Sequence, residues 1–176
     1  MLDRGGGERG QTLKWHRGED ELEIRPYRPD DEPHLFDIFQ AAIRSMGARH
    51  YSPEQIEAWA GPRVSAARLG AMYGDGRTTF IAVDVKDKPV AFSDMEADGH
   101  VDMLYCHPAQ AGRGVASLLL AAIDGAARQA GLSRLHAEAS ETARPVFERA
   151  GYRMVMRRDF EIEGVAMHNW KMEKQV

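Results

Sequence analysis

Apolar positions along the chain follow a period of two in some segments and a spacing of three or four residues in others. Alternating apolar and polar residues favour half-buried strands, whereas apolar residues three and four positions apart favour amphipathic helices. With the turn residues between segments, this pattern predicts strands at 22–26, 78–85, 89–95, 100–106, 135–139, 152–162 and 166–173. The expected helices are one that opens at 29–32 and others at 53–59, 63–73, 113–130 and 141–150.

The order of these elements predicts the fold class. Short turns join the strands 78–85, 89–95 and 100–106, so these three should form an antiparallel meander. Helix 113–130 then leads to strand 135–139, which the right-handed crossover rule places beside and parallel to strand 100–106. The prediction is an α/β (α+β) fold whose central mixed, mostly antiparallel sheet has about seven strands and is flanked by about four or five helices.

Composition narrows the organisation of the chain. With 176 residues, of which 43% are apolar, residues 21–176 should form a single domain around one core. Residues 1–20 are rich in glycine and charge, so they are expected to be a flexible extension. A net charge of −4 gives no reason to expect a nucleic-acid partner.

Cysteine content and hydropathy indicate in which cellular compartment the protein is expected. The single cysteine, Cys106, excludes an internal disulfide and fits a reducing environment. No apolar run approaches the roughly 20 residues that cross a bilayer. The beginning of the sequence lacks the apolar stretch of a signal peptide or membrane anchor. We therefore expect a cytoplasmic protein that does not engage a membrane.

The segment HPAQAGRGVAS at 107–117 joins the end of a strand to the start of a helix. A helix start exposes unpaired backbone N–H groups at the positive end of the helix dipole, and glycine lets an anion approach them closely. Gly112 and Gly114 therefore describe an anion site to which Arg113 could add charge, although glycine before a helix can also serve only the turn. The segment matches neither a P-loop nor a dinucleotide fingerprint.

Several motifs in this order resemble the GNAT superfamily of acyl-CoA-dependent N-acetyltransferases. Its central motif, Gln/Arg-x-x-Gly-x-Gly/Ala, is met at 111–116, except that Ala111 replaces the usual Gln or Arg. A second motif of the family is matched by Ser140, Ala143, Phe147, Glu148, Gly151 and Tyr152. The strand 168–174 looks like the family's usual ending, and the segments 51–59 and 100–105 are similar to its YafP-like bacterial branch.

The resemblance implies acetyl-CoA as the donor substrate, with the pyrophosphate on the loop and the pantetheine arm along strand 100–106. In the family the arm pairs with backbone where this strand splays from its parallel neighbour, and an N–H near Leu104 would polarise the thioester. The residues expected to bind coenzyme A are Leu104, Tyr105, Cys106, Ala111, Gly112, Arg113, Gly114, Val115, Ala116, Ser117, Ser140 and Phe147.

Acetyl transfer to an amine needs a group that accepts the ammonium proton. Asp102 is the first candidate, because alternation places it with His100 and Leu104 on one strand face. In similar polyamine acetyltransferases a carboxylate also stands at this position. An ordinary Asp pKa of about 3.9 makes a weak base for an ammonium, so burial or a water relay would be needed. His100 is the alternative because imidazole titrates near neutrality, and Asp94 and Glu96 remain open as well.

The proton donor for the leaving thiolate is where the chain departs from the family. Phe147 stands at the position of the family's usual tyrosine and has no proton to give. Tyr152 lies beyond Gly151 and cannot be assumed to substitute, and alternation should turn Tyr105 to the face opposite Asp102. Three alternatives remain: the thiolate leaves without a donor, water or another side chain serves, or the reaction is slow.

Cys106 could suggest an acyl-enzyme, but His107 is its sequence neighbour and should point to the opposite face, so a small buried side chain is the simpler interpretation.

The family places the acceptor pocket between the N-terminal helices and the last two strands. The candidate walls are Tyr51, Trp59 and Trp170, and the candidate partners of a cationic amine are Glu54, Glu57 and Asp94. The histidines show no metal-binding spacing, so no metal site is expected.

Three functional hypotheses follow. The first is acetyl transfer to the primary amine of a small molecule by direct attack in a ternary complex. The second is acetylation of a protein N-terminus or lysine, which would require an open groove. The third is a non-catalytic acyl-CoA-binding module, motivated by Phe147. The sequence leaves the oligomeric state open, although similar proteins are often homodimers.

Overall fold

A computed structural model describes residues 3–4, 13–17 and 20–176. Its helices are Glu32–Ser45 (α1), Pro53–Trp59 (α2), Ala66–Tyr73 (α3), Val115–Gln129 (α4) and Arg144–Arg149 (α5), with short 3-10 helices at Gly47–Arg49 and Pro108–Gln110. Its strands are Asp3–Arg4 (β1), Leu13–Arg17 (β2), Asp20–Pro26 (β3), Thr78–Val83 (β4), Pro89–Met95 (β5), His100–Val101 (β6), Leu104–Cys106 (β7), Arg134–Ala139 (β8), Arg153–Ile162 (β9) and Val165–Gln175 (β10).

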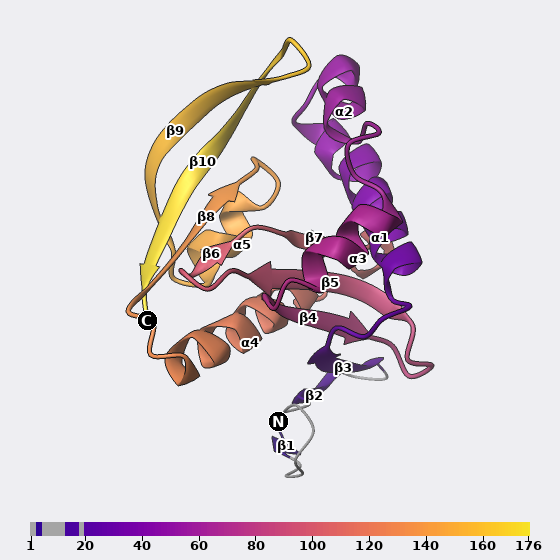
Figure 1. Ribbon diagram of the computed structural model, residues 1–176, viewed down its shortest axis with the longest axis vertical. Helices are drawn as coiled ribbons and strands as arrows, with labels where there is room; N and C mark the ends of the chain where they lie inside the picture. Colours follow the sequence, from indigo (N-terminus) through magenta and orange to yellow (C-terminus); the bar gives the residue numbers. More distant parts are fainter. Residues whose placement is uncertain (1–2, 5–12, 18–19) are drawn as a thin grey trace.

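The strands form two sheets that part in the middle of the molecule. One sheet has the order β1-β2-β3-β4-β5-β7 and the other the order β6-β8-β10-β9. Figure 1 shows the long β9–β10 hairpin rising away from the first sheet, opposite α1 and α2. Apart from the parallel pair β6–β8, all pairs are antiparallel, which confirms the predicted mixed, mostly antiparallel α/β fold with its helices.

The predicted strand 100–106 is wrong as a single element. It divides into β6, which pairs with β8 in parallel, and β7, which pairs with β5. Asp102 and Met103 between them belong to neither strand, because the backbone there leaves one sheet for the other. The crossover prediction itself is confirmed, since His100 is the Cα partner of His136.

Part of the predicted N-terminal extension is strand. β2 pairs with β3 from Leu13 opposite Ile24 to Arg17 opposite Asp20, and β1 pairs with β2. Residues 1–2, 5–12 and 18–19 of the predicted extension lie outside the described residues. The boundary between an extension and a domain at residue 21 therefore stays a prediction.

Helices cover both faces of the first sheet. α1 and α3 pack on one face with Leu35, Phe39, Leu69 and Phe92 in their core cluster, and α4 packs on the other with Leu119. The predicted capping box at α2 is confirmed: Ser52 Oγ accepts from Gln55 N, and Gln55 Oε1 accepts from Ser52 N. No helix among the described residues is long and apolar enough to cross a bilayer.

A buried ion pair fastens the start of α1 to β3. Arg25 donates from both terminal nitrogens to the two carboxylate oxygens of Asp31, each at 2.8 Å. Its Nε also donates to Asp87 Oδ1 at 2.9 Å. Both members of the Arg25–Asp31 pair are almost completely buried, so this bidentate contact fixes how helix and sheet meet.

Candidate active site

A cavity of about 560 Å³ opens where the two sheets part. Its helix side includes Phe39, Tyr51 and Trp59. On the sheet side the lining runs from Val101 to Cys106 and from Glu138 to Ser140. The cavity therefore brings together the divided strand, the end of β8 and the N-terminal helices.

The break between β6 and β7 is held by Asp94 on β5. Met103 N donates to Asp94 Oδ1 at 2.8 Å, while Met103 O accepts from Asp94 N at 3.2 Å. Ser93 Oγ donates to the same carbonyl at 2.9 Å. These bonds satisfy the Met103 backbone although it lies in no strand, so the bend is a defined conformation.

The backbone of Leu104 and Cys106 faces the space that β8 vacates. Asp94 N donates to Met103 O, and His107 N donates to Val90 O, so the odd-numbered positions of this segment bond to β5. Because backbone groups alternate along a strand, those of Leu104 and Cys106 point the other way. β7 is also the last strand of its sheet among the described residues. Its outer edge can therefore pair with an extended, amide-containing ligand, as the splay predicted from the family requires.

The predicted anion loop has the geometry that it needs. Gly112 and Gly114 adopt φ values of 75° and 86°, in the region that favours glycine. No heavy atom lies within 4 Å of where a Cβ would stand on either residue. α4 begins at Val115, whose side chain is buried, and the first-turn N–H groups of Val115, Ala116 and Ser117 have no acceptor within the helix.

Two residues at that loop have small side chains, which leave room for a ligand. Ala111 and Ala116 both line the cavity. Arg113 Nη1 donates to Gln110 Oε1 at 3.0 Å, and its backbone N–H donates to Gln110 O. The loop thus offers backbone donors at its centre, with the Arg113 guanidinium held beside it.

Arg77 forms ion pairs with four carboxylates, those of Asp75, Asp94, Glu96 and Asp102, of which that of Asp102 belongs to a residue that lines the cavity. Its Nη1 lies 3.1 Å from Asp94 Oδ2 and 3.3 Å from Asp102 Oδ2. The Asp94 side chain is 0% exposed, whereas that of Asp102 is 35% exposed. Burial raises the pKa of Asp94 to about 6, against the lowering effect of the Met103 N–H and Arg77.

The candidate bases differ in their position relative to the cavity. Asp102 and Leu104 line the cavity, but His100 is not among the described lining residues. His100 Nε2 lies 2.6 Å from Glu138 Oε2, and its ring stacks on that of His136. Burial lowers the pKa of His100, but the bond to Glu138 and the neighbouring carboxylates outweigh it, so the pKa lies above its usual value.

Of the predicted acceptor residues, the structure places Tyr51 and Trp59 in the cavity wall. Their rings meet edge to face with centroids 5.3 Å apart, and the Tyr51 hydroxyl accepts from Glu141 N at 3.0 Å. Asp94 is fully buried and is not a lining residue, so its place favours holding Met103 over touching a substrate.

The remaining acceptor candidates lie elsewhere. Trp170 packs in the core beside α5 with the Arg144 guanidinium 5.1 Å from its ring, so it forms no cavity wall. Glu57 pairs with Arg44 on the surface, and Glu54 is exposed. Neither glutamate lines the cavity among the described residues.

Three further predicted coenzyme A residues, Ser140, Phe147 and Cys106, also line the cavity. Ser140 Oγ accepts from Ala143 N at 3.1 Å, which shapes the turn into α5. Phe147 is buried and meets Tyr152 edge to face at 4.9 Å. Burial raises the pKa of the Cys106 thiol to about 11, and His107 Nδ1 accepts from Ala109 N, so the two do not form a dyad.

Tyr105 was expected to face away from Asp102. Both residues line the cavity, as does every residue from Val101 to Cys106, so the lining does not test which faces the two side chains take, and the expectation stays a prediction. Tyr105 stacks on Phe92 with ring centroids 5.6 Å apart.

The sequence interpretation missed three polar residues of the site. Arg77 carries no motif, and only the fold brings it to Asp94 and Asp102. Glu138 lines the cavity, but it stands at an ordinary polar position of the alternating strand β8, so the sequence pattern alone did not mark it. His168 also lines the cavity, with Nε2 2.9 Å from Glu141 Oε1.

Comparison with known proteins agrees with this geometry. A family model described as Acetyltransferase (GNAT) domain matches residues 47–174. The chain is 33% identical over 151 residues to the uncharacterized N-acetyltransferase YafP of Escherichia coli (strain K12), covering 86% of this chain and 94% of YafP.

Solved structures give the same result. A GCN5-related N-acetyltransferase from Rhodopseudomonas palustris superposes with a TM-score of 0.80 at 35% identity, covering 87% of this chain and 94% of that one. The PaiA N-acetyltransferase from Thermoplasma acidophilum, solved in complex with coenzyme A, has a TM-score of 0.72 at 16% identity, covering 88% of this chain and 99% of that one. This second likeness concerns the fold alone.

Proposed function

Because the chain belongs to the GNAT family of acetyltransferases and uses acetyl-CoA, we propose that it acetylates the primary amine of a small molecule by direct attack in a ternary complex. One observation carries the choice of a small acceptor. On the acceptor side, α2 is tied to β10 by a 2.7 Å hydrogen bond from Gln55 Nε2 to Ala166 O. A polypeptide acceptor would need an open groove at this place.

The donor would occupy the loop and the free edge of β7. The first-turn N–H groups of α4 and the open space at Gly112 and Gly114 suit a pyrophosphate. The outward-facing backbone of Leu104 and Cys106 suits the amides of a pantetheine arm. Acetyl-CoA supplies the thioester, and the Leu104 N–H is the donor that we assign to its carbonyl oxygen.

Asp102 is the base in this proposal. Among the candidates drawn from the sequence, it is the one that lines the cavity, and its side chain is 35% exposed. Its carboxylate would first take one proton of the acceptor ammonium, directly or through one water, and the free amine would then attack the acetyl carbon. As the carbon–sulfur bond breaks and the amide forms, the nitrogen gives up its second proton to solvent. Arg77 and Asp94 are positioning residues that hold Asp102 and the bend at Met103.

The thiolate would leave without a protein donor and take its proton from solvent. Phe147 lines the cavity where the family has a tyrosine, and it has no hydroxyl. A thiolate is a much weaker base than an alkoxide, so it can depart without help. The raised pKa of Cys106 disfavours an acyl-enzyme, which supports direct attack.

The test is an acceptor screen that measures release of the coenzyme A thiol. The panel contains small primary amines, peptides with a free N-terminus and peptides whose only free amine is a lysine side chain. We expect release with small amines and none above background with peptides. Release with peptides alone would overturn the choice of acceptor, and tight coenzyme A binding without release for any amine would overturn the enzyme proposal.

Gln55→Glu sharpens this screen because it removes the Nε2 donor that bonds α2 to β10 and keeps a side-chain oxygen that can accept from Ser52 N in the capping box. If closure selects small acceptors, the variant should gain turnover with lysine peptides and keep its turnover with small amines. Glu54→Ala, an exposed change on the same helix, is the matched control.

We also propose a cytoplasmic location and a homodimer. The single, buried Cys106 is compatible with a reducing compartment. The exposed apolar side chains of Met154, Val155 and Met156 lie on β9, the last strand of its sheet, and offer a surface for a second copy.

A further inference from the structure

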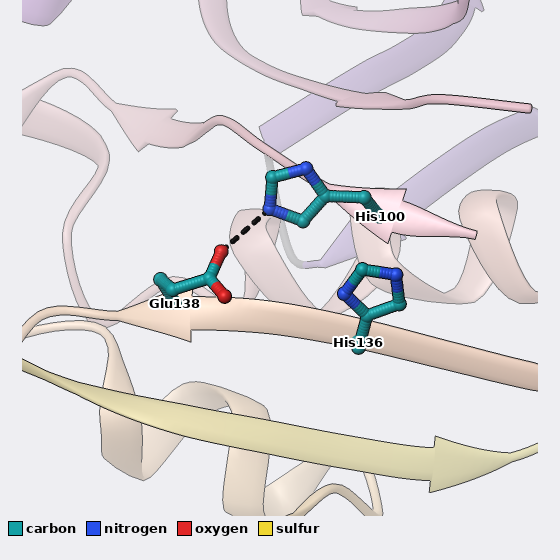
Figure 2. Close-up of side chains that lie close together, drawn as sticks. All are labelled: His100, His136 and Glu138. Carbon is teal, nitrogen blue, oxygen red and sulfur yellow. Dashed lines mark hydrogen bonds and ion pairs between the residues drawn. The ribbon is translucent and has the colours of Figure 1, made fainter. Parts of the chain in front are cut away.

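Three side chains with metal-ligand chemistry meet on the paired strands β6 and β8. His100 and His136 are direct Cα partners in the parallel pair, and Glu138 follows two residues later on the same face of β8. Figure 2 shows both imidazoles and the carboxylate turned toward a common space. One ligand atom from each residue lies within 4.8 Å of the others, and the two rings stack with centroids 5.0 Å apart.

Each imidazole has a carboxylate at its second nitrogen. His100 Nε2 faces Glu138, while its Nδ1 lies 3.4 Å from Glu96 Oε2. His136 Nε2 lies 3.5 Å from Asp98 Oδ2, which leaves Nδ1 for the common space. Metal-binding histidines commonly have such a partner, because it fixes the ring and makes the ligating nitrogen more basic.

Glu138 is arranged in the same way. Its Oε2 faces His100, whereas its Oε1 lies 3.2 Å from Arg158 Nη1. One oxygen can therefore bind an ion while the other keeps its partner on β9. The three ligating atoms lie within 4.8 Å of one another and would approach to about 3.3 Å, the spacing of ligands around one zinc ion, when the ion binds.

We propose that His100, His136 and Glu138 bind one divalent transition-metal ion, with zinc as the reference ion. Two imidazoles and one carboxylate suit zinc and its neighbours, whereas magnesium and calcium prefer oxygen ligands. Of the three ligands, only Glu138 also lines the cavity, so the ion would lie at the edge of the candidate active site. Bound there, it would tie β6 to β8 immediately before the strand breaks.

The test measures binding to the full chain without an affinity tag, after removal of metals by a chelator. Titration with zinc chloride against a chromophoric chelator should give one ion per chain. His136→Asn should weaken binding at least as much as the about 10–100-fold loss that follows removal of an outer-shell partner. His34→Asn, a change at an exposed histidine on α1, should bind as the wild type does.

Thermal unfolding gives a second readout that is independent of any enzymatic activity. Zinc should raise the Tm of the wild type and of His34→Asn, but not that of His136→Asn, because an ion bound only to the folded state stabilises it. Magnesium should leave all three Tm values unchanged. Equal zinc affinity in the wild type and His136→Asn, or no saturable binding, would overturn the proposal.

Discussion

Two arginines gather carboxylates in this molecule, and they do so in different surroundings. Arg25 pairs with Asp31 and Asp87 at the junction of β3 and α1, where its side chain is 3% exposed. Arg77 pairs with four carboxylates at the break between β6 and β7. The Arg25 cluster contributes no described lining residue to the cavity, whereas the Arg77 cluster contributes Asp102.

The difference separates a structural ion pair from one that serves a site. In the Arg25 cluster the main partner, Asp31, is almost as completely buried as the arginine. This ion pair therefore only fixes β3 and α1 relative to each other. In the Arg77 cluster the arginine holds a fully buried Asp94 and a partly exposed Asp102 on the same nitrogen. That arrangement keeps one carboxylate accessible to the cavity at a fixed place.

Arg77→Met should have the largest effect, because it damages both stability and turnover. It leaves Asp94 buried without its cation, and breaking a buried pair costs about 3–5 kcal/mol of unfolding free energy. It also releases Asp102, so turnover per folded molecule should fall. Denaturant unfolding and thiol release on the same sample measure both; a loss of stability with full turnover would contradict the role given to Arg77.

Arg25→Met is the matched variant at the other cluster. It should lower the free energy of unfolding by a similar amount, about 3–5 kcal/mol, because Asp31 is left buried. Turnover per folded molecule should stay at the wild-type level, since nothing in this cluster reaches the cavity. A fall in turnover at temperatures where the variant is fully folded would remove the distinction between the clusters.

Asp94→Asn should change how stability depends on pH. Burial raises the pKa of Asp94 from 3.8 to about 6, so the folded chain binds this proton more tightly than the unfolded chain does. The wild type should therefore lose stability relative to the variant as the pH rises from about 4 to about 6. The total change is on the order of 3 kcal/mol, with no further change above that range. Unfolding curves across this range check the sign, and parallel curves would refute it.

Phe147→Tyr should have the smallest effect. It restores a hydroxyl at the position where the family has a tyrosine, but a thiolate that leaves unaided gains little from a donor. We expect kcat to rise by less than about tenfold, below the about 10²–10⁴-fold that general acid catalysis supplies where it is needed. A rise within that larger range would show that departure of the thiolate limits the wild-type enzyme.

The sequence predicted what local patterns determine. Helix periodicity, the capping box at Ser52 and the glycine loop before α4 each depend on neighbours within one segment, and all are present. The parallel placement of β8 followed from chain topology alone. The loop and strand edge that we propose for the donor could therefore be predicted from residues 104–117 without a structure.

The proposed acceptor side of the site depends on the bend at Asp102 and Met103, which no local sequence pattern predicts. Alternation through 100–106 predicted one continuous strand, but the chain leaves one sheet for the other at Asp102 and Met103, and of His100 and Asp102 only Asp102 lines the cavity among the described residues. Arg77 and the His100–His136 stack are long-range encounters between segments with no motif of their own. Spacing rules for metal sites likewise do not consider side chains that meet across paired strands, as the three proposed ligands do.

We propose that Asp102, held by Arg77, accepts the proton of the amine. This role is tested by kcat for thiol release in Asp102→Asn, measured with the coenzyme A Kd on the same preparation and with Asp159→Asn, an exposed aspartate on β9, as control. We expect kcat to fall by about 10²–10⁴-fold while the Kd is unchanged and the control is normal. A kcat within a few-fold of the wild type would contradict it.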